Sequence, residues 1–336
     1  MPQVTVFIPV YNKASYLKEC LDSVLNQEYK DFEILLVDDV STDNSVEIIN
    51  SYHHSSLRLI RNQKNMGPGG CSNMAIEEAH GKYLVRMDAD DISPLNRLSL
   101  QVKYMEDHPE IVASSGNVQC FGADNGLWKY PHKDKEAKAS MLFSTPVCQG
   151  ACIMRLDQIR KSGVRYGSVS NYIGEDRVFW FDLRKKIQFG NLNEVVLHYR
   201  RGSQNIAHDK NFNRIEIRKN IIRYMMEHCG FSVTENDIEF HLMATGIFPE
   251  KLNESHLKGL KEWLEKLNEW NNASGEFPPD AFFKKTEQIW DAFFFRVLKE
   301  GVPLTRFYFS LCAQIKPEHR KYFLKYRINR WIGRKK

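Results

Sequence analysis

The stretch Gly81–Asp91 constrains the fold of this chain more than any other. Residues 83–87 are mostly apolar and β-favouring, which is typical of a buried parallel strand, and the strand ends abruptly in Asp88, Asp90 and Asp91. Ligands of open α/β sheets bind just beyond the carboxyl ends of strands. These carboxylates either hold a hard divalent cation as an Asp-x-Asp pair, or form an acidic turn before the helix expected near Pro94.

The first hundred residues alternate between strand patterns and helix patterns. Short apolar strands are expected at 4–8, 32–37 and 57–60, and each is followed by apolar residues at helical spacing. We expect a flexible turn at Asn65–Gly70 and a helix from Cys71 to Ala79. This order predicts an α/β fold, with a mainly parallel sheet and helices on both of its faces.

The second half of the chain has a looser pattern. Residues 111–199 read as mixed α and β structure, with a helix near 135–142 and a helix that begins at Glu175 and Asp176. From about residue 211 onward, apolar residues recur at helical spacing, with a loop expected at 271–280. The pattern therefore predicts a helical C-terminal region after the α/β part.

Composition excludes several classes of protein. The 336 residues carry 47 basic and 42 acidic side chains, a net charge of +5, which does not indicate nucleic-acid binding. The start of the chain has no signal-peptide pattern and no window reaches about 18 apolar residues, so we expect a cytoplasmic protein. The seven cysteines are scattered, and Cys148 and Cys152 lack a second pair to complete a zinc site. We expect reduced thiols, with Cys148 and Cys152 in a packed strand.

Polar and aromatic residues follow three of the expected strands. They are Pro9–Asn12 after the first strand, Asp38 and Asp39 after the second, and the acids of Gly81–Asp91 after the fourth. Parallel strands place these ends along one edge of the sheet, so the three sets can meet at one ligand. Tyr11 could stack on a base while an Asp accepts hydrogen bonds from a base or a ribose. Considered one at a time, these residues also have structural explanations: Tyr11 could cover the core, and the acids could be turn residues.

Five segments of the chain, in this order and spacing, resemble the motifs of family 2 glycosyltransferases. They are Pro9–Asn12, Val37–Ser45, Asn65–Gly67 with Asn73, Gly81–Asp91 and Gly174–Asp176. The resemblance covers about residues 3–205. It implies the GT-A fold, a nucleotide-sugar donor, Mg²⁺ or Mn²⁺ as cofactor, and inversion at the anomeric carbon.

The resemblance also assigns roles to individual residues. It implies that Asp176 is the general base, that Asp90 binds the metal, and that Asp88 lies on the ribose side of the Asp-x-Asp motif. Glu175 is a supporting residue, because a helix turns its side chain about 100° away from that of Asp176. An acidic cap of the helix is the structural alternative for this pair. The residues implied to bind the nucleotide-sugar are Pro9, Tyr11, Asp39, Asn65, Gly67 and Asn73.

The match to the family weakens in residues 197–205. Arg200 is a candidate to clamp the pyrophosphate, although an exposed basic loop is the alternative. Whether His198 or His208 completes the metal site stays open.

The predicted domains follow from these assignments. Residues 1–208 form the GT-A catalytic domain, with a nucleotide-sugar half at about 1–110 and an acceptor half at about 111–208. Residues 209–336 form a helical region that ends in a basic, aromatic tail. This tail either contacts an anionic membrane or is a solvated or packed segment.

We therefore expect an inverting glycosyltransferase, with UDP as the favoured nucleotide, that acts on a hydroxyl of a glycan or lipid-linked glycan in bacterial surface polysaccharide synthesis. Its expected location is the cytoplasm or the inner face of the plasma membrane. The alternatives are a sugar-nucleotide pyrophosphorylase and a non-catalytic binding module. A pyrophosphorylase would carry a glycine-rich basic loop where this chain has Tyr11–Ser15, and a dehydrogenase would carry G-x-G-x-x-G.

Overall fold

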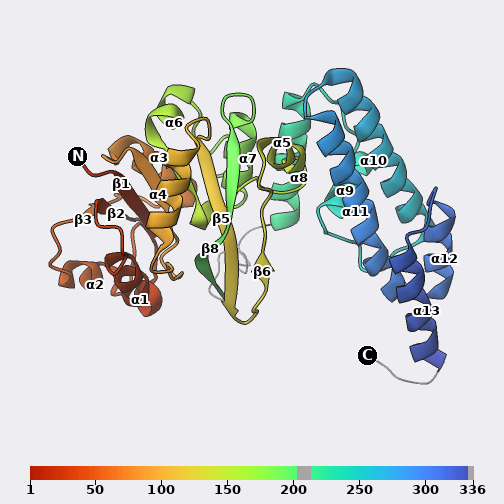
Figure 1. The fold of residues 1–336 in the computed structure, drawn as a ribbon, viewed down its shortest axis with the longest axis horizontal. Coiled ribbons are helices and arrows are strands. Elements are labelled where there is room, and N and C mark those ends of the chain that lie inside the picture. The colour runs from red at the N-terminus through yellow and green to blue at the C-terminus, as the bar shows by residue number, and fades with distance from the viewer. Residues whose placement is uncertain (203–212, 332–336) are drawn as a thin grey trace. The chain divides into compact units, whose positions relative to one another are not determined.

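The computed structural model describes residues 1–202 and 213–331. The chain forms two compact units, Met1–Ile221 and Ile222–Lys336 (Figure 1). The predicted domain boundary at residues 208 and 209 lies outside the described residues. Each unit is described below by itself.

The N-terminal unit is built on a mixed, mainly parallel sheet. Its strands follow the order β3-β2-β1-β4-β7-β5-β6, and β8 pairs with β5. β1, β2, β3 and β4 run parallel, as predicted, whereas β7 is antiparallel to both β4 and β5. The strands are β1 Val4–Val10, β2 Phe32–Asp38, β3 Leu57–Arg61, β4 Tyr83–Arg86, β5 Ala113–Gly122, β6 Leu127–Trp128, β7 Ile153–Arg155 and β8 Phe189–Arg201.

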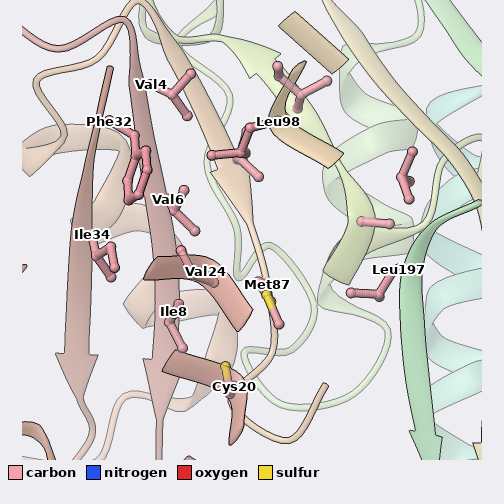
Figure 2. Close-up of a cluster of buried hydrophobic side chains, with 14 of the residues drawn as sticks. Val4, Val6, Ile8, Cys20, Val24, Phe32, Ile34, Met87, Leu98 and Leu197 are labelled. Carbon is pink, nitrogen blue, oxygen red and sulfur yellow. The ribbon is translucent and has the colours of Figure 1, made fainter. Parts of the chain in front are cut away.

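Helices pack on this sheet through apolar stripes. Figure 2 shows Val6 and Ile8 of β1 beside Val24 and Cys20 of α1, all at most 1% exposed. Each such side chain contributes about 1.5–3 kcal/mol on burial. The helices of this unit are α1 Ala14–Leu25, α2 Ser45–Ser51, α3 Gly67–Glu78, α4 Arg97–Asp107, α5 Asp134–Ser140, α6 Leu156–Ser162 and α7 Glu175–Leu183.

Two local predictions were wrong. The turn expected at Asn65–Gly70 is largely the first turn of α3, which begins at Gly67 rather than at Cys71. Pro68 suits the first helical turn, where no backbone donor is needed. A carboxylate from outside the helix caps its start, as described below. Cys148 and Cys152 are buried thiols, as expected, but they flank the 3₁₀ turn η1 Gln149–Ala151 rather than forming a strand.

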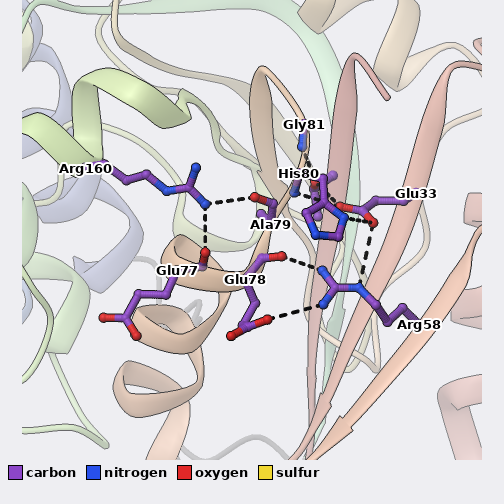
Figure 3. Close-up of polar contacts among 9 residues, drawn as sticks. Glu33, Arg58, Glu77, Glu78, Ala79, His80, Gly81 and Arg160 are labelled. Atoms are coloured by element: carbon purple, nitrogen blue, oxygen red, sulfur yellow. Dashed lines mark hydrogen bonds and ion pairs between the residues drawn. The ribbon is translucent and has the colours of Figure 1, made fainter. Parts of the chain in front are cut away.

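The C-terminal end of α3 is held to its surroundings by two arginines (Figure 3). The Arg160 guanidinium donates to the carbonyl groups of Ile76, Glu77 and Ala79 at 2.7–2.9 Å. These carbonyls have no partner within the helix, so a charged donor stabilises them. Arg58 of β3 contacts Glu78. The helix is thereby fixed at the end opposite to its glycine-rich start.

The C-terminal unit consists of helices. Large aromatic side chains, among them Trp263, Trp290, Phe294 and Tyr308, fill its core and are at most 4% exposed. Its helices are α9 Glu235–Ala244, α10 Glu254–Ser274, α11 Pro279–Glu300, α12 Val302–Ser310 and α13 Pro317–Trp331, while α8 Arg214–His228 contains the division between the units. Throughout residues 1–202 and 213–331, every helix is too short or too polar to cross a membrane. The predicted α/β fold with a helical C-terminal region is confirmed.

Candidate active site

The strand ends that carry the predicted site residues lie side by side. β1 pairs with β2 up to Val10 and Asp38, and with β4 up to Phe7 and Arg86. Beyond the strands, the Asp39 amide donates to the Val10 carbonyl at 2.8 Å. The carboxyl ends of β1, β2 and β4 therefore form one edge, on which Pro9, Tyr11, Asp39 and the Asp88–Asp91 acids all lie.

Asp39 is almost fully buried and organises the start of α3. Its Oδ1 accepts hydrogen bonds from Asn62 Nδ2 at 2.7 Å and from the Met66 amide at 2.8 Å, and its Oδ2 accepts one from the Gly67 amide at 2.8 Å. A carboxylate at a helix N-terminus satisfies amides that have no partner within the helix. Asn65 adds to this cap, because its Nδ2 donates to the Asp39 carbonyl at 3.1 Å.

The loops after β1 and β2 support each other. The Asn12 amide donates to Ser41 Oγ at 3.0 Å, and the Thr42 amide donates to Asn12 Oδ1 at 2.8 Å. Asn12 has φ +52° and Val40 has φ +69°. A β-branched residue such as Val40 is strained in the left-handed region, so surrounding contacts must hold this loop in shape. Tyr11 lies beside it with half of its surface exposed, so its ring is accessible to a ligand.

Gly67 and Asn73 hold the segment that leads into α7. A Cβ at Gly67, where φ is +71°, would lie 2.7 Å from the Asn171 carbonyl oxygen, so only glycine fits without movement. The Asn73 side chain donates from Nδ2 to the Tyr166 carbonyl at 3.0 Å, and its Oδ1 accepts a hydrogen bond from the Tyr166 backbone amide at 2.9 Å. In this arrangement both ends of the Asn73 side chain position residues 166–171.

Asp88 is oriented by an arginine that the sequence did not single out. Nε and Nη2 of Arg86 donate to Asp88 Oδ1 at 3.3 and 3.2 Å, while Nη1 donates to Ser72 Oγ at 2.8 Å. Arg86 is 4% exposed, and a Cβ on Gly150 would lie 3.1 Å from Asp88 Oδ2. The Asp88 carboxylate is thus held by Arg86 on one side and closely approached by the Gly150 backbone on the other.

Asp90, the predicted metal ligand, is paired with a lysine. Lys13 Nζ lies 2.6 Å from Asp90 Oδ2, and the Asp90 side chain is 7% exposed. The carboxylate therefore already faces a cation, and its hard oxygen donors suit Mg²⁺ or Mn²⁺. Across the two described ranges, no group of three His, Cys, Asp or Glu residues is arranged to hold a metal ion. A divalent cation at Asp90 would therefore need further ligands, such as phosphate or water oxygens.

Asp91 and Arg200 connect the acidic loop to β8. Asp91 Oδ1 accepts the Arg200 amide at 2.8 Å, and burial, together with the charges of Asp88 and Asp90, raises the pKa of Asp91. The Arg200 guanidinium donates to the Asp90 carbonyl at 2.8 Å and forms an ion pair with Glu19. Arg200 thus holds the backbone of the acidic loop, Asp88–Asp91, in place.

Of the two histidines considered for the metal site, the structure describes His198. The His198 backbone pairs with Ile92 through hydrogen bonds of 2.9 and 3.0 Å. His208 lies outside the described residues.

Glu175 and Asp176 begin α7, as predicted. Burial and the neighbouring Asp176 charge raise the pKa of Glu175 to about 8, and Arg86 opposes this shift. Burial also raises the pKa of Asp176, while the Arg177 amide, which donates to Asp176 Oδ1 at 2.8 Å, opposes the rise. Both carboxyl groups interact electrostatically with Asp88 and Arg86, so α7 begins beside the end of β4.

Comparison with known protein families gives a match to the part of the chain that carries most of these residues. The model of the family described as "Glycosyl transferase family 2" matches residues 5–186. An uncharacterized glycosyltransferase of Haemophilus influenzae is 27% identical over 249 residues, which cover 69% of this chain and 77% of the relative. A second one from that organism is 37% identical over 191 residues, covering 56% of this chain and 74% of the relative.

Solved structures share the architecture. The crystal structure of S. aureus TarS 1-349 in complex with UDP-GlcNAc gives a TM-score of 0.58 at 15% identity, over 86% of this chain and 92% of that one. The complex of the same TarS fragment with UDP gives 0.57 at 16% identity, with the same coverage. At this level of identity the likeness shows the fold alone, and it confirms the predicted GT-A fold.

Proposed function

The chain belongs to glycosyl transferase family 2, and we propose that it is an inverting, metal-dependent enzyme that uses a nucleoside-diphosphate sugar, with UDP favoured. The acceptor is a hydroxyl of a glycan or lipid-linked glycan in bacterial surface polysaccharide synthesis. The observation that carries the proposal is the electrostatic interaction of Asp176, at the start of α7, with Asp88 of the acidic segment that follows β4. TarS, which shares the fold, was crystallised with UDP and with UDP-GlcNAc, and this supports the choice of nucleotide.

The nucleoside half of the donor is assigned to the ends of β1 and β2. The exposed ring of Tyr11 offers a stacking face for the base. Asp39 Oδ2 accepts a hydrogen bond from the Gly67 amide, and a carboxylate oxygen can accept a second one from a base or a ribose. In this proposal Pro9, Asn65 and Gly67 shape the surrounding wall, Asn73 holds residues 166–171 against it, and Asp88 faces the ribose.

The diphosphate half is assigned to Asp90. Its carboxylate would hold Mg²⁺ or Mn²⁺ together with phosphate oxygens, because a small hard cation is commonly bound by one or two carboxylates plus substrate phosphates. When bound, the cation offsets the negative charge that develops on the departing diphosphate. Arg200 contributes by holding the Asp90 backbone in place.

Asp176 is assigned as the general base. The acceptor oxygen attacks the anomeric carbon from the face opposite to the diphosphate, the bond from that carbon to the diphosphate oxygen breaks, and the acceptor proton passes to the Asp176 carboxylate. A single base is sufficient for inversion, whereas retention by double displacement needs a second carboxylate as nucleophile. Glu175 has a pKa of about 8, so it is mainly protonated at neutral pH and less suited than a carboxylate to accept the proton.

Helix α13 supports a further part of the proposal, contact with an anionic membrane. Leu324 and Ile328 are 57% and 48% exposed and lie four residues apart, on one face of the helix. Exposed basic side chains flank this pair at helical spacing. They are Arg320, Lys321, Lys325 and Arg327. An apolar ridge between cations suits the boundary between acyl chains and anionic headgroups, and on this ground we propose that the enzyme binds the inner face of the plasma membrane.

Substitution of Asp90 tests the function directly. Asp90→Ala is expected to abolish metal-dependent transfer and to weaken UDP binding in the presence of Mn²⁺, because the carboxylate links the cation to the protein. Asp31→Ala, an exposed acid at the start of β2, is the matched control and should behave as wild type. Full transfer by Asp90→Ala, or undiminished wild-type transfer in EDTA, contradicts the proposal. Absence of both transfer and donor hydrolysis in the wild type would favour a non-catalytic binding module.

A further inference from the structure

The Lys13–Asp90 ion pair places a protein cation on the carboxylate that we assign to the metal. Lys13 Nζ and Asp90 Oδ2 are 2.6 Å apart, and the two side chains are 21% and 7% exposed. We infer that Lys13 pairs with Asp90 until the donor binds, and that its side chain then moves so that the ammonium group contacts the donor diphosphate. This inference rests on the proposed function, and it makes binding of the cation dependent on binding of the nucleotide.

The backbone of Lys13 is fixed, so its side chain is the part that can move. The Lys13 amide donates to Ser45 Oγ at 3.0 Å, and Ser45 is fully buried. The next amide, that of Ala14, donates to Asp43 Oδ2 at 2.9 Å, and Asp43 Oδ1 accepts from Ser45 Oγ at 2.6 Å. This network anchors the start of α1. A lysine side chain on a fixed backbone has a flexible four-carbon stem that can reach more than one partner near its Cα.

A divalent cation and the Lys13 ammonium group would compete for the same carboxylate. Two positive groups that both contact Asp90 Oδ2 would repel each other strongly at this partly buried site. Binding of the cation therefore has to displace Lys13, and the displaced ammonium needs a new negative partner. Asp88 is already paired with Arg86, and Asp91 is only 1% exposed, so an ammonium group that reached it would have to give up its water. A diphosphate supplies the missing partner.

The diphosphate also supplies the missing metal ligands. Within the described part of the chain, the protein offers no cluster of three candidate ligands at Asp90 or elsewhere. A nucleoside diphosphate thus contributes oxygens to the cation and negative charge to Lys13 in one step. Two ligands that each improve the site for the other bind with positive coupling, typically 5–150-fold in affinity.

The experiment measures Mn²⁺ binding itself, by electron paramagnetic resonance titration of MnCl₂ with and without saturating UDP. For the wild type, UDP should raise Mn²⁺ affinity at least about 10-fold. In Lys13→Met, Mn²⁺ alone should bind several-fold more tightly, and the enhancement by UDP should shrink. Lys13→Arg should retain most of the coupling because it retains the charge.

Lys18→Met is the matched control. Lys18 is exposed on α1, the helix that Lys13 precedes, and carries the same charge, so this variant tests whether net charge alone alters the affinity. It should behave as wild type. A melting temperature close to that of the wild type verifies that Lys13→Met is folded.

The outcomes separate this inference from the proposed function. If the wild type binds Mn²⁺ with UDP and Lys13→Met shows the same affinities, or if Lys18→Met shifts them equally, the role of Lys13 is overturned and metal dependence stands. If the wild type binds no Mn²⁺ with or without UDP, both are overturned.

Discussion

The Asp39 carboxylate accepts the Gly67 amide at 2.8 Å across a separation of 28 residues, which joins the end of β2 to the start of α3. Gly67 in turn lies against the Asn171 carbonyl, and Gly69 donates its amide to the same oxygen at 2.9 Å. The start of α3 therefore positions two parts of the site. On one side it holds Asp39, which we assign to the nucleotide, and on the other it holds the segment that leads into α7.

Gly67→Ala should disturb both neighbours. The new Cβ would carry the cost of a left-handed backbone, roughly 1–2 kcal/mol, and in addition would collide with the Asn171 carbonyl at 2.7 Å. Gly163→Ala is the matched control, because Gly163 has nearly the same φ, +70°, with nothing within 4 Å. Thermal unfolding should show a larger loss for Gly67→Ala, accompanied by weaker UDP binding. Equal losses in the two variants would show that the contact with Asn171 does not matter.

The location of the site could be predicted from sequence, whereas its internal contacts could not. Parallel strands force their carboxyl ends together, so Asp39 and Asp88 could be assigned to one edge without coordinates. The start of α3 was missed because its cap, Asp39, comes from the loop after β2. Lys13 and Arg86 were missed because a charged side chain near a site can point in several directions, and its partner is known only once the strands are paired. The positive φ of Val40 could not be predicted either, because a valine in a sequence does not indicate a left-handed backbone.

The stability of the protein should depend on the ionisation of Glu175. Its pKa rises from 4.5 to about 8 on folding, so between these values the folded state keeps a proton that the unfolded chain has lost. Stability from this group is therefore complete below about pH 4.5 and falls as the pH rises to about 8. Glu175→Gln cannot ionise, and its melting temperature relative to wild type should rise between about pH 5 and about pH 9.

Glu47→Gln is the control for this titration, since Glu47 is an exposed acid in the first turn of α2. Its difference from wild type should stay nearly constant over the same range. A constant difference for Glu175→Gln as well would mean that Glu175 titrates normally.

The ridge on α13 should determine membrane binding. The double variant Leu324→Gln with Ile328→Gln removes the exposed apolar pair while leaving every basic residue in place, and co-sedimentation with vesicles of phosphatidylglycerol and phosphatidylcholine should fall about 10-fold or more. Phe283→Gln, which removes an exposed apolar side chain from α11, should sediment as wild type. Transfer to a soluble acceptor should be unaffected in both. Equal sedimentation of all forms at low salt, where surface attraction is strongest, would remove α13 as the contact.

The central claim is that Asp176 accepts the acceptor's proton, and Asp176→Asn tests it most directly. The amide keeps the shape of the side chain but cannot take up a proton, so UDP affinity by calorimetry should stay near wild type while the transfer rate at saturating acceptor falls by at least about 10². If Asp176 only caps α7, asparagine serves nearly as well and both quantities should change little. The account predicts unchanged affinity with a rate at least about 100-fold lower. A variant that keeps most of its rate would contradict it.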